Sequence, residues 1–152
     1  MNEDLADMLD GLDLFKRFSY RELQTFCRYL RLEEKKKGES IFLEGDPGTE
    51  MLILTDGRMA VSKGGADGGP HLLSYEGKGR IIGEMALLDQ ERRSATCIAD
   101  TDCSLLCINA ANLERMAQDY PPLAYKFMFT LAQLLSKRLR RTSGVLAEFL
   151  VG

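Results

Sequence analysis

A series of short apolar or alternating segments, separated by glycine, aspartate and proline, fills the chain from residue 32 to residue 108. Segments of this length between turn residues are typical of β-strands. Many short strands at even spacing favour a β-barrel or a jelly roll, architectures that limit the exposed strand edges a flat sheet would leave. The expected strands are residues 40–43, 51–54, 59–62, 71–75, 81–82, 95–99 and 104–108.

Helical patterns precede this β-region. Residues 5–14 have the apolar spacing of one or two short helices, interrupted by Gly11. Ser19 followed by Glu22 is a capping-box signature, in which each side chain satisfies a backbone N–H of the other residue. The pair therefore predicts the start of a further helix.

Helices are also expected after the last strand. Residues 109–116 have the pattern of a short helix, and Pro121 with Pro122 indicates the first turn of a long one, because proline is tolerated there and not in a helix interior. We therefore expect an α+β fold, mainly β: a double-stranded β-helix or jelly-roll barrel with N-terminal helices, one short helix inside the barrel region and a long C-terminal helix.

Apolar residues of the long helix recur at alternating steps of four and three, which is the pattern of a coiled-coil seam. A second edge, formed by Phe127, Leu131 and Leu134, can dock on the barrel while the seam meets a partner helix. In the alternative, both edges pack on the chain's own barrel. The seam residues are Met128, Ala132, Leu135, Leu139, Thr142, Leu146 and Phe149.

Size and charge narrow the classes of function. A chain of 152 residues fits one domain, and a formal net charge of −3 argues against a general attraction to nucleic acid or anionic membranes. The basic residues at 137–141 are expected to fan around a solvated helix face rather than contact DNA. No long apolar run suggests a membrane span, and an N-terminus that opens with Asn2, Glu3 and Asp4 has the wrong charge for a signal peptide, so a cytoplasmic location is expected.

The cysteines and the single histidine do not indicate a metal centre. Cys103 and Cys107 share one strand face, and their spacing matches neither a zinc knuckle nor a redox motif. We expect these residues, together with Cys27 and Cys97, to be buried apolar side chains in a reducing compartment.

Residues 79–96 are the most informative run for function. Gly83 permits an unusual backbone angle or a close backbone approach, and residues 84–88 are good helix formers. A helix N-terminus offers free amides to an anion, and Arg93 supplies a guanidinium suited to bidentate phosphate contact. This run predicts a phosphate site; the alternative is an ordinary surface ion pair between Glu84 and Arg93.

The same run resembles the phosphate-binding cassette of cyclic nucleotide-binding domains. The resemblance rests on Gly83-Glu84-Met85-Ala86-Leu87-Leu88, four further residues, and then Arg93-Ser94-Ala95-Thr96. Upstream, Lys37-Gly38-Glu39-Ser40-Ile41, Glu44-Gly45 and Gly57 resemble the glycine-punctuated first half of that family's β-roll. The order of elements agrees from about residue 9 to residue 149. One departure is Arg92, which stands where the family often has proline; the spacing favours Arg93 as the phosphate ligand.

The resemblance implies roles for individual residues. Glu84 would accept a hydrogen bond from the ribose 2′-OH, Arg93 would pair with the cyclic phosphate, and Ser94 would help to hold phosphate or base. Gly83, Met85 and Ala86 complete the ligand-binding set in the cassette. Thr142 and Ser143 fall near the place where a Thr-Ser pair in catabolite activator-like members reaches the base; the alternative is a seam threonine beside an exposed serine.

The resemblance also implies one domain over residues 1–152, with N-terminal helices at 1–31, a β-roll at 32–108 that contains the cassette at 79–96, and C-terminal helices at 109–152. The expected function is a non-enzymatic sensor that binds cAMP or cGMP, needs no cofactor, forms a homodimer through its last helix and acts on that dimer or on a protein effector. The alternatives are the sensor half of a truncated transcription regulator and a barrel that no longer binds nucleotide.

Overall fold

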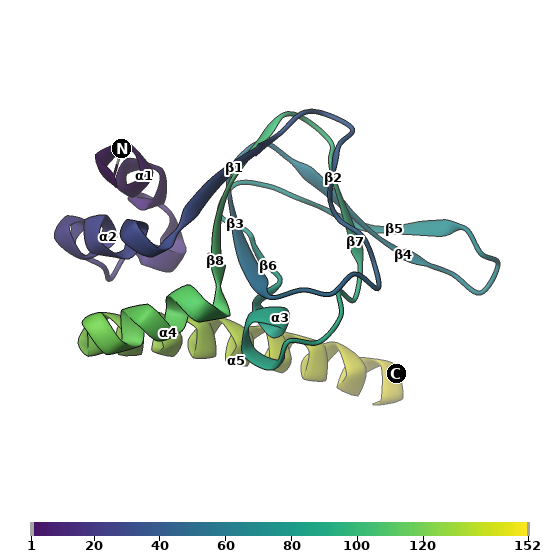
Figure 1. Cartoon of the computed structure of the whole chain (residues 1–152). Helices are drawn as coiled ribbons and strands as arrows, with labels where there is room; N and C mark the ends of the chain where they lie inside the picture. The colour runs from purple at the N-terminus through teal and green to yellow at the C-terminus, as the bar shows by residue number, and fades with distance from the viewer. Residues whose placement is uncertain (1, 152) are drawn as a thin grey trace. The chain divides into compact units, whose positions relative to one another are not determined.

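The computed structural model describes residues 2–151, apart from the side chains of residues 2, 3, 147, 149 and 151. It divides into two compact units, whose boundary lies between residues 115 and 116. The first unit contains the N-terminal helices and all the strands. Most of the second unit is one long helix (Figure 1).

The first unit begins with helices α1 (Asn2–Leu9) and α2 (Tyr20–Phe26) and the 3-10 turns η1 (Asp13–Phe15) and η2 (Cys27–Tyr29). The predicted capping box is confirmed: the Glu22 amide donates to Ser19 Oγ at 3.1 Å and the Ser19 amide donates to Glu22 Oε1 at 2.8 Å. Phe15, Phe18 and Phe26 pack their rings together, with centroids 5.3 to 6.3 Å apart. This cluster gives the helices a small apolar core of their own.

Eight strands form two antiparallel sheets, and the predicted α+β jelly roll is confirmed. Successive strands mostly alternate between the sheets, which is the arrangement of a double Greek key. Figure 1 shows the sheets facing each other. The first sheet has the order β1 (Arg31–Lys35), β8 (Cys103–Asn109), β3 (Glu50–Asp56) and β6 (Ile81–Ile82); the second has the order β2 (Ser40–Phe42), β7 (Thr96–Ala99), β4 (Met59–Gly64) and β5 (Pro70–Glu76).

Strand β1 is the element that sequence analysis did not predict. Its sequence, RLEEK, is too charged to show an apolar strand pattern, but it pairs along its whole length with β8, from Arg31 opposite Cys107 to Lys35 opposite Cys103. The β-region therefore begins at Arg31 and ends at Asn109. Tertiary pairing here overrides a weak local preference.

The core between the sheets is made of apolar side chains from both. Because side chains alternate across a strand, Leu52 and Leu54 share one face of β3, and Cys103, Leu105 and Cys107 share one face of β8. Cys27, Cys97, Cys103 and Cys107 are free and buried, as expected. The cluster also includes Met59, Ile82, Cys97 and Ala99, with Ile41, Phe42 and Val61 packed against it.

Three α-helices follow strand β6 in the chain. The six-residue α3 (Glu84–Asp89) connects β6 to β7, α4 (Ala110–Asp119) follows β8, and α5 (Pro121–Val151) starts at the predicted proline pair. Asn109 caps α4, since its Oδ1 accepts a hydrogen bond from the Asn112 amide at 2.7 Å. Among the described residues, no helix combines the length and the apolar character needed to cross a bilayer.

Burial changes along α5. Leu123, Ala124, Phe127 and Leu131 in its first half are buried. In its second half, Leu139 is 67% exposed and Leu146 is 55% exposed, and both belong to the predicted seam. The side chain of the last seam residue, Phe149, lies outside the described residues.

Candidate functional site

The turn between β6 and α3 is built on Gly83. This residue has φ 78° and ψ 13°, in the left-handed region that favours glycine, and it is the N-cap of α3. The expected unusual backbone angle is therefore confirmed. A Cβ at Gly83 would also collide with Arg93 Nη1 and would lie 2.8 Å from the carbonyl oxygen of Glu50. Glycine is required here for both reasons.

A second glycine gives room to the same side chain. A Cβ at Gly48 would lie within 3 Å of the Nε, Cζ and Cδ atoms of Arg93. The Arg93 guanidinium therefore rests against two stretches of backbone, one before β3 and one before α3. No side chain larger than hydrogen fits at either point without moving Arg93.

Arg93 comes from the loop that leads into β7. Its backbone is fixed to the loop after β2, because the Arg93 amide donates to the Asp46 carbonyl at 2.8 Å and the Gly45 amide donates to the Arg93 carbonyl at 2.9 Å. The guanidinium carbon lies 4.3 Å from the centroid of the Phe42 ring, in cation–π contact. The side chain is thus held from several sides and has little freedom to move.

The Arg93 guanidinium is buried without a hydrogen-bond partner in the described part of the chain. The residue is 9% exposed, and its Nε and Nη1 are buried and unbonded. Burial lowers the pKa of Arg93, although the negative charge of Glu50 acts in the opposite direction. A buried cation with unused donors is costly, and an anion that enters the site would satisfy it.

The other cassette residues divide into buried and exposed positions. Glu84 is 8% exposed and Ala86 is 5% exposed. Because Glu84 and Arg93 are both buried, the alternative of an exposed surface ion pair is wrong. Met85 is 60% exposed, and Ser94 is also exposed, with its carbonyl oxygen accepting a hydrogen bond from Lys63 Nζ at 2.8 Å.

The structure distinguishes the two neighbouring arginines. Arg92 is exposed, and its Nη1 donates to the Gly45 carbonyl at 2.8 Å. Arg93 is buried, with donors unused. The inward orientation therefore belongs to Arg93, as the spacing indicates.

Thr142 and Ser143 lie on α5 in the second unit. Both are exposed, and the Thr142 hydroxyl donates to the Arg138 carbonyl at 3.0 Å, one helical turn earlier. Their contact with a ligand base stays a prediction.

Sequence analysis missed the residues that support Arg93. The sequence analysis includes Phe42 only as part of an expected strand and does not single out Gly48. The sequence gives a weak signal for Gly48, because a glycine before an apolar strand often marks a close approach of backbone. It gives no signal for Phe42, whose contact with Arg93 spans more than fifty positions of sequence.

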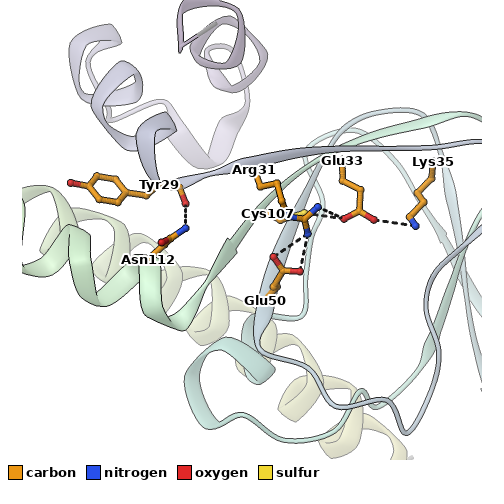
Figure 2. Close-up of polar contacts among 7 residues, drawn as sticks. All are labelled: Tyr29, Arg31, Glu33, Lys35, Glu50, Cys107 and Asn112. Carbon is orange, nitrogen blue, oxygen red and sulfur yellow. Dashed lines mark hydrogen bonds and ion pairs between the residues drawn. The ribbon is translucent and has the colours of Figure 1, made fainter.

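A polar network joins side chains of β1 and β3 (Figure 2). Arg31 Nη2 donates to both carboxylate oxygens of Glu50, at 2.9 and 3.1 Å, and Arg31 Nη1 donates to Glu33 at 2.8 Å. Glu33 also pairs with Lys35 at 3.1 Å and accepts a 3.7 Å contact from the Cys107 thiol. Burial lowers the pKa of Arg31, but its hydrogen bonds to Glu33 and Glu50 outweigh this and raise it overall.

The chain is similar in sequence and structure to known proteins. Residues 32–120 match the model of the cyclic nucleotide-binding domain. The chain is 29% identical over 132 residues to the cyclic AMP receptor protein of Thermus thermophilus, and 32% identical over 123 residues to a cyclic nucleotide-gated potassium channel of Mesorhizobium japonicum. A crystal structure of a cyclic nucleotide-binding domain from Methylobacillus flagellatus superposes with a TM-score of 0.81 at 28% identity.

These alignments cover the chain and its relatives unequally. They span 87% of this chain and 59% of the Thermus protein, 81% of this chain and 33% of the channel, and 96% of this chain and 82% of the Methylobacillus domain. The chain therefore spans about three fifths of the Thermus relative and one third of the channel.

Substitution of Gly83 tests the geometry of the turn. We expect Gly83→Ala to lower the free energy of unfolding by about 1–3 kcal/mol, because alanine is strained at a positive φ and its Cβ displaces Arg93. Urea unfolding followed by circular dichroism measures the change. Gly144→Ala is the matched control: Gly144 lies inside α5 with nothing within 4 Å of its Cβ position. There the same substitution should raise helix stability by up to about 1 kcal/mol. Equal effects at the two positions would contradict the assignment.

Proposed function

The chain belongs to the cyclic nucleotide-binding domain family, and on that premise we propose that it is a sensor module that binds cAMP or cGMP. The observation that carries this proposal is the buried guanidinium of Arg93, whose Nε and Nη1 have no partner in the described part of the chain. A cyclic phosphate has one negative charge and two free oxygens, which suit a planar bidentate donor.

The positions of the other cassette residues support the roles that we propose for them. Glu84 is buried one residue after Gly83, where its carboxylate can accept the ribose 2′-OH. Ser94, directly after Arg93, is exposed and free to contact phosphate or base. Gly83 and Ala86 allow the ligand to approach the backbone, and Met85 is an exposed apolar side chain at the edge of the site.

The proposed activity is binding without turnover. The family is regulatory rather than catalytic, and hydrolysis of a cyclic phosphate ester needs a metal centre or a placed general acid and base. The residues assigned here stabilise the ground state of an anion: a guanidinium, a carboxylate that accepts a hydroxyl, and small residues that give access. These groups form a receptor.

We propose α5 as the output element and as the contact for a second copy of the chain. Its exposed leucines, Leu139 and Leu146, continue a heptad pattern that two parallel helices would bury. Thr142 and Ser143 lie on the same stretch and would contact the base. Ligand binding and dimer geometry would then be coupled through one helix, which requires different contacts in the two states.

A second candidate is the sensor part of a longer regulator, which the partial coverage of the Thermus relative favours. It shares the ligand and the site with the first candidate and differs only in the effector, which would be attached rather than separate. We also propose a reducing compartment, the cytoplasm, which the free and buried state of the four described cysteines supports.

Removal of the Arg93 side chain tests the phosphate contact. We expect Arg93→Ala to weaken cAMP or cGMP binding by roughly 2–5 kcal/mol, because a shielded phosphate then loses its charged partner. Isothermal titration calorimetry with both nucleotides measures the loss, and circular dichroism checks that folding survives. Arg92→Ala is the control, since Arg92 is exposed, and its effect should be small. A large loss of affinity in Arg92→Ala with a small one in Arg93→Ala would show that the wrong arginine has been assigned.

The ribose contact is tested with a 2′-deoxy ligand. Glu84→Ala should weaken binding of the natural nucleotide and have little effect on the 2′-deoxy analogue, because the mutation and the missing hydroxyl remove the same hydrogen bond. A double-mutant cycle over the two proteins and two ligands gives the coupling. If both ligands lose affinity equally, Glu84 has a structural role instead.

The role of α5 is tested by amide hydrogen exchange and by sedimentation. Saturating nucleotide should slow amide hydrogen exchange in residues 135–150, because ligand contact and seam formation protect the same helix. Leu139→Lys places a charge in the proposed seam and should shift sedimentation from dimer to monomer. Unchanged exchange, together with a variant that sediments like the parent, would exclude α5 as both switch and seam.

A further inference from the structure

Glu50 is the carboxylate that acts most strongly on Arg93. Among the charges that influence the pKa of Arg93, that of Glu50 has the largest effect. Its backbone is adjacent as well: the Glu50 carbonyl oxygen and Arg93 Nη1 both lie within 3 Å of the point that a Gly83 Cβ would occupy. Glu50 and Arg93 are therefore neighbours across the turn before α3.

The Glu50 side chain also projects to the same side of the sheet as Arg93. Residues 50, 52 and 54 alternate along β3 and share a face, and Leu52 and Leu54 belong to the core between the sheets. Phe42 packs against that core, and the Arg93 guanidinium lies over the Phe42 ring. The carboxylate of Glu50 is thus an internal anion on the same side of the sheet as the unpaired cation.

Glu50 and Arg93 nevertheless form no ion pair. Both oxygens of the Glu50 carboxylate accept hydrogen bonds from Arg31 Nη2, at 2.9 and 3.1 Å (Figure 2). Arg31 is fixed in turn by Glu33, two residues along β1, at 2.8 Å. The carboxylate is held toward β1, while Arg93 Nε and Nη1 remain without a partner in the described part of the chain.

We propose that Arg31 is a positioning residue, which keeps the Glu50 carboxylate on β1 and so keeps the Arg93 guanidinium available to an external anion. The inference rests on the proposed function, because the anion is the phosphate of the nucleotide. Without Arg31, the Glu50 carboxylate turns toward Arg93 and competes with the ligand. Binding then requires displacement of an internal partner, which lowers the apparent affinity by the fraction of molecules in which the site is free.

The test is a cycle of Arg31→Gln and Glu50→Gln, with cAMP and cGMP titrated calorimetrically into all four proteins. Arg31→Gln should weaken binding roughly two- to fivefold, the scale of a partly exposed carboxylate–arginine pair. In the Glu50→Gln background the same substitution should have no effect, because the competitor is gone. The loss should also shrink at high salt, which screens the competing pair.

Lys35→Gln is the matched control. It removes one positive charge from the same strand, and Lys35 pairs with Glu33 rather than with Glu50. A general electrostatic effect on the anion would make Lys35→Gln and Arg31→Gln equally harmful, and would leave the effect of Arg31→Gln unchanged in the Glu50→Gln background. Either result would overturn the proposal.

A ligand-free measurement separates this inference from the proposed function. The ¹H–¹⁵N signal of the Arg93 Nε–H group, assigned by its loss in Arg93→Lys, should shift and exchange more slowly with solvent in Arg31→Gln than in the parent protein. It should return to the parent position in the double variant. If the parent binds neither nucleotide, the proposed function fails while this signal still decides the role of Arg31. An Arg93 signal that is the same in all four proteins refutes the positioning role, even where nucleotide binds.

Discussion

The structure of the site depends on the contact between the buried Arg93 guanidinium and the surrounding backbone. Arg93 lies against Gly48 and Gly83 and over the ring of Phe42, and its Nε and Nη1 find no hydrogen-bond partner among the described residues. Burial of a cation in this way works against folding, so the surrounding elements must hold it in place. The left-handed turn at Gly83 and the hydrogen bonds of the Arg93 backbone to the loop after β2 serve this purpose. The nucleotide phosphate that we propose as the ligand would offset this cost.

The sequence predicted those parts of the fold that have a local signature. The capping box at Ser19 and Glu22, the proline start of α5 and the apolar strands can each be identified within a window of a few residues, and each is present. The cassette was identified because Gly83 and Arg93 lie close together in sequence. β1 was not predicted, because its strand character comes from pairing with β8, roughly seventy positions away. The support of Arg93 by Phe42 and Gly48 was missed for a similar reason: no residue near Phe42 marks its contact, and the local signal at Gly48 is weak.

The charged side chains of β1, which prevented its prediction as a strand, have a structural role. Three charged side chains on one face, those of Arg31, Glu33 and Lys35, would be unfavourable on a central strand, but β1 is an edge strand of its sheet. Charged residues at an edge oppose pairing with other chains, and here they also form a connected network with Glu50. One set of side chains can therefore protect an edge and order a carboxylate near the site. Conflicts between local pattern and final structure are expected at such functional positions.

The buried cysteines have a consequence for how opening of the barrel can be observed. Burial raises the pKa of the Cys97 and Cys107 thiols to about 12, so at neutral pH both are protonated and shielded from reagents. Cys97 belongs to β7 in one sheet and Cys107 to β8 in the other, and both face the shared core. Alkylation of either thiol requires that its sheet separate from the core. Each sheet therefore contains a thiol whose alkylation rate reports local unfolding of that sheet. Comparison of the two rates would show whether the sheets separate together or one after the other.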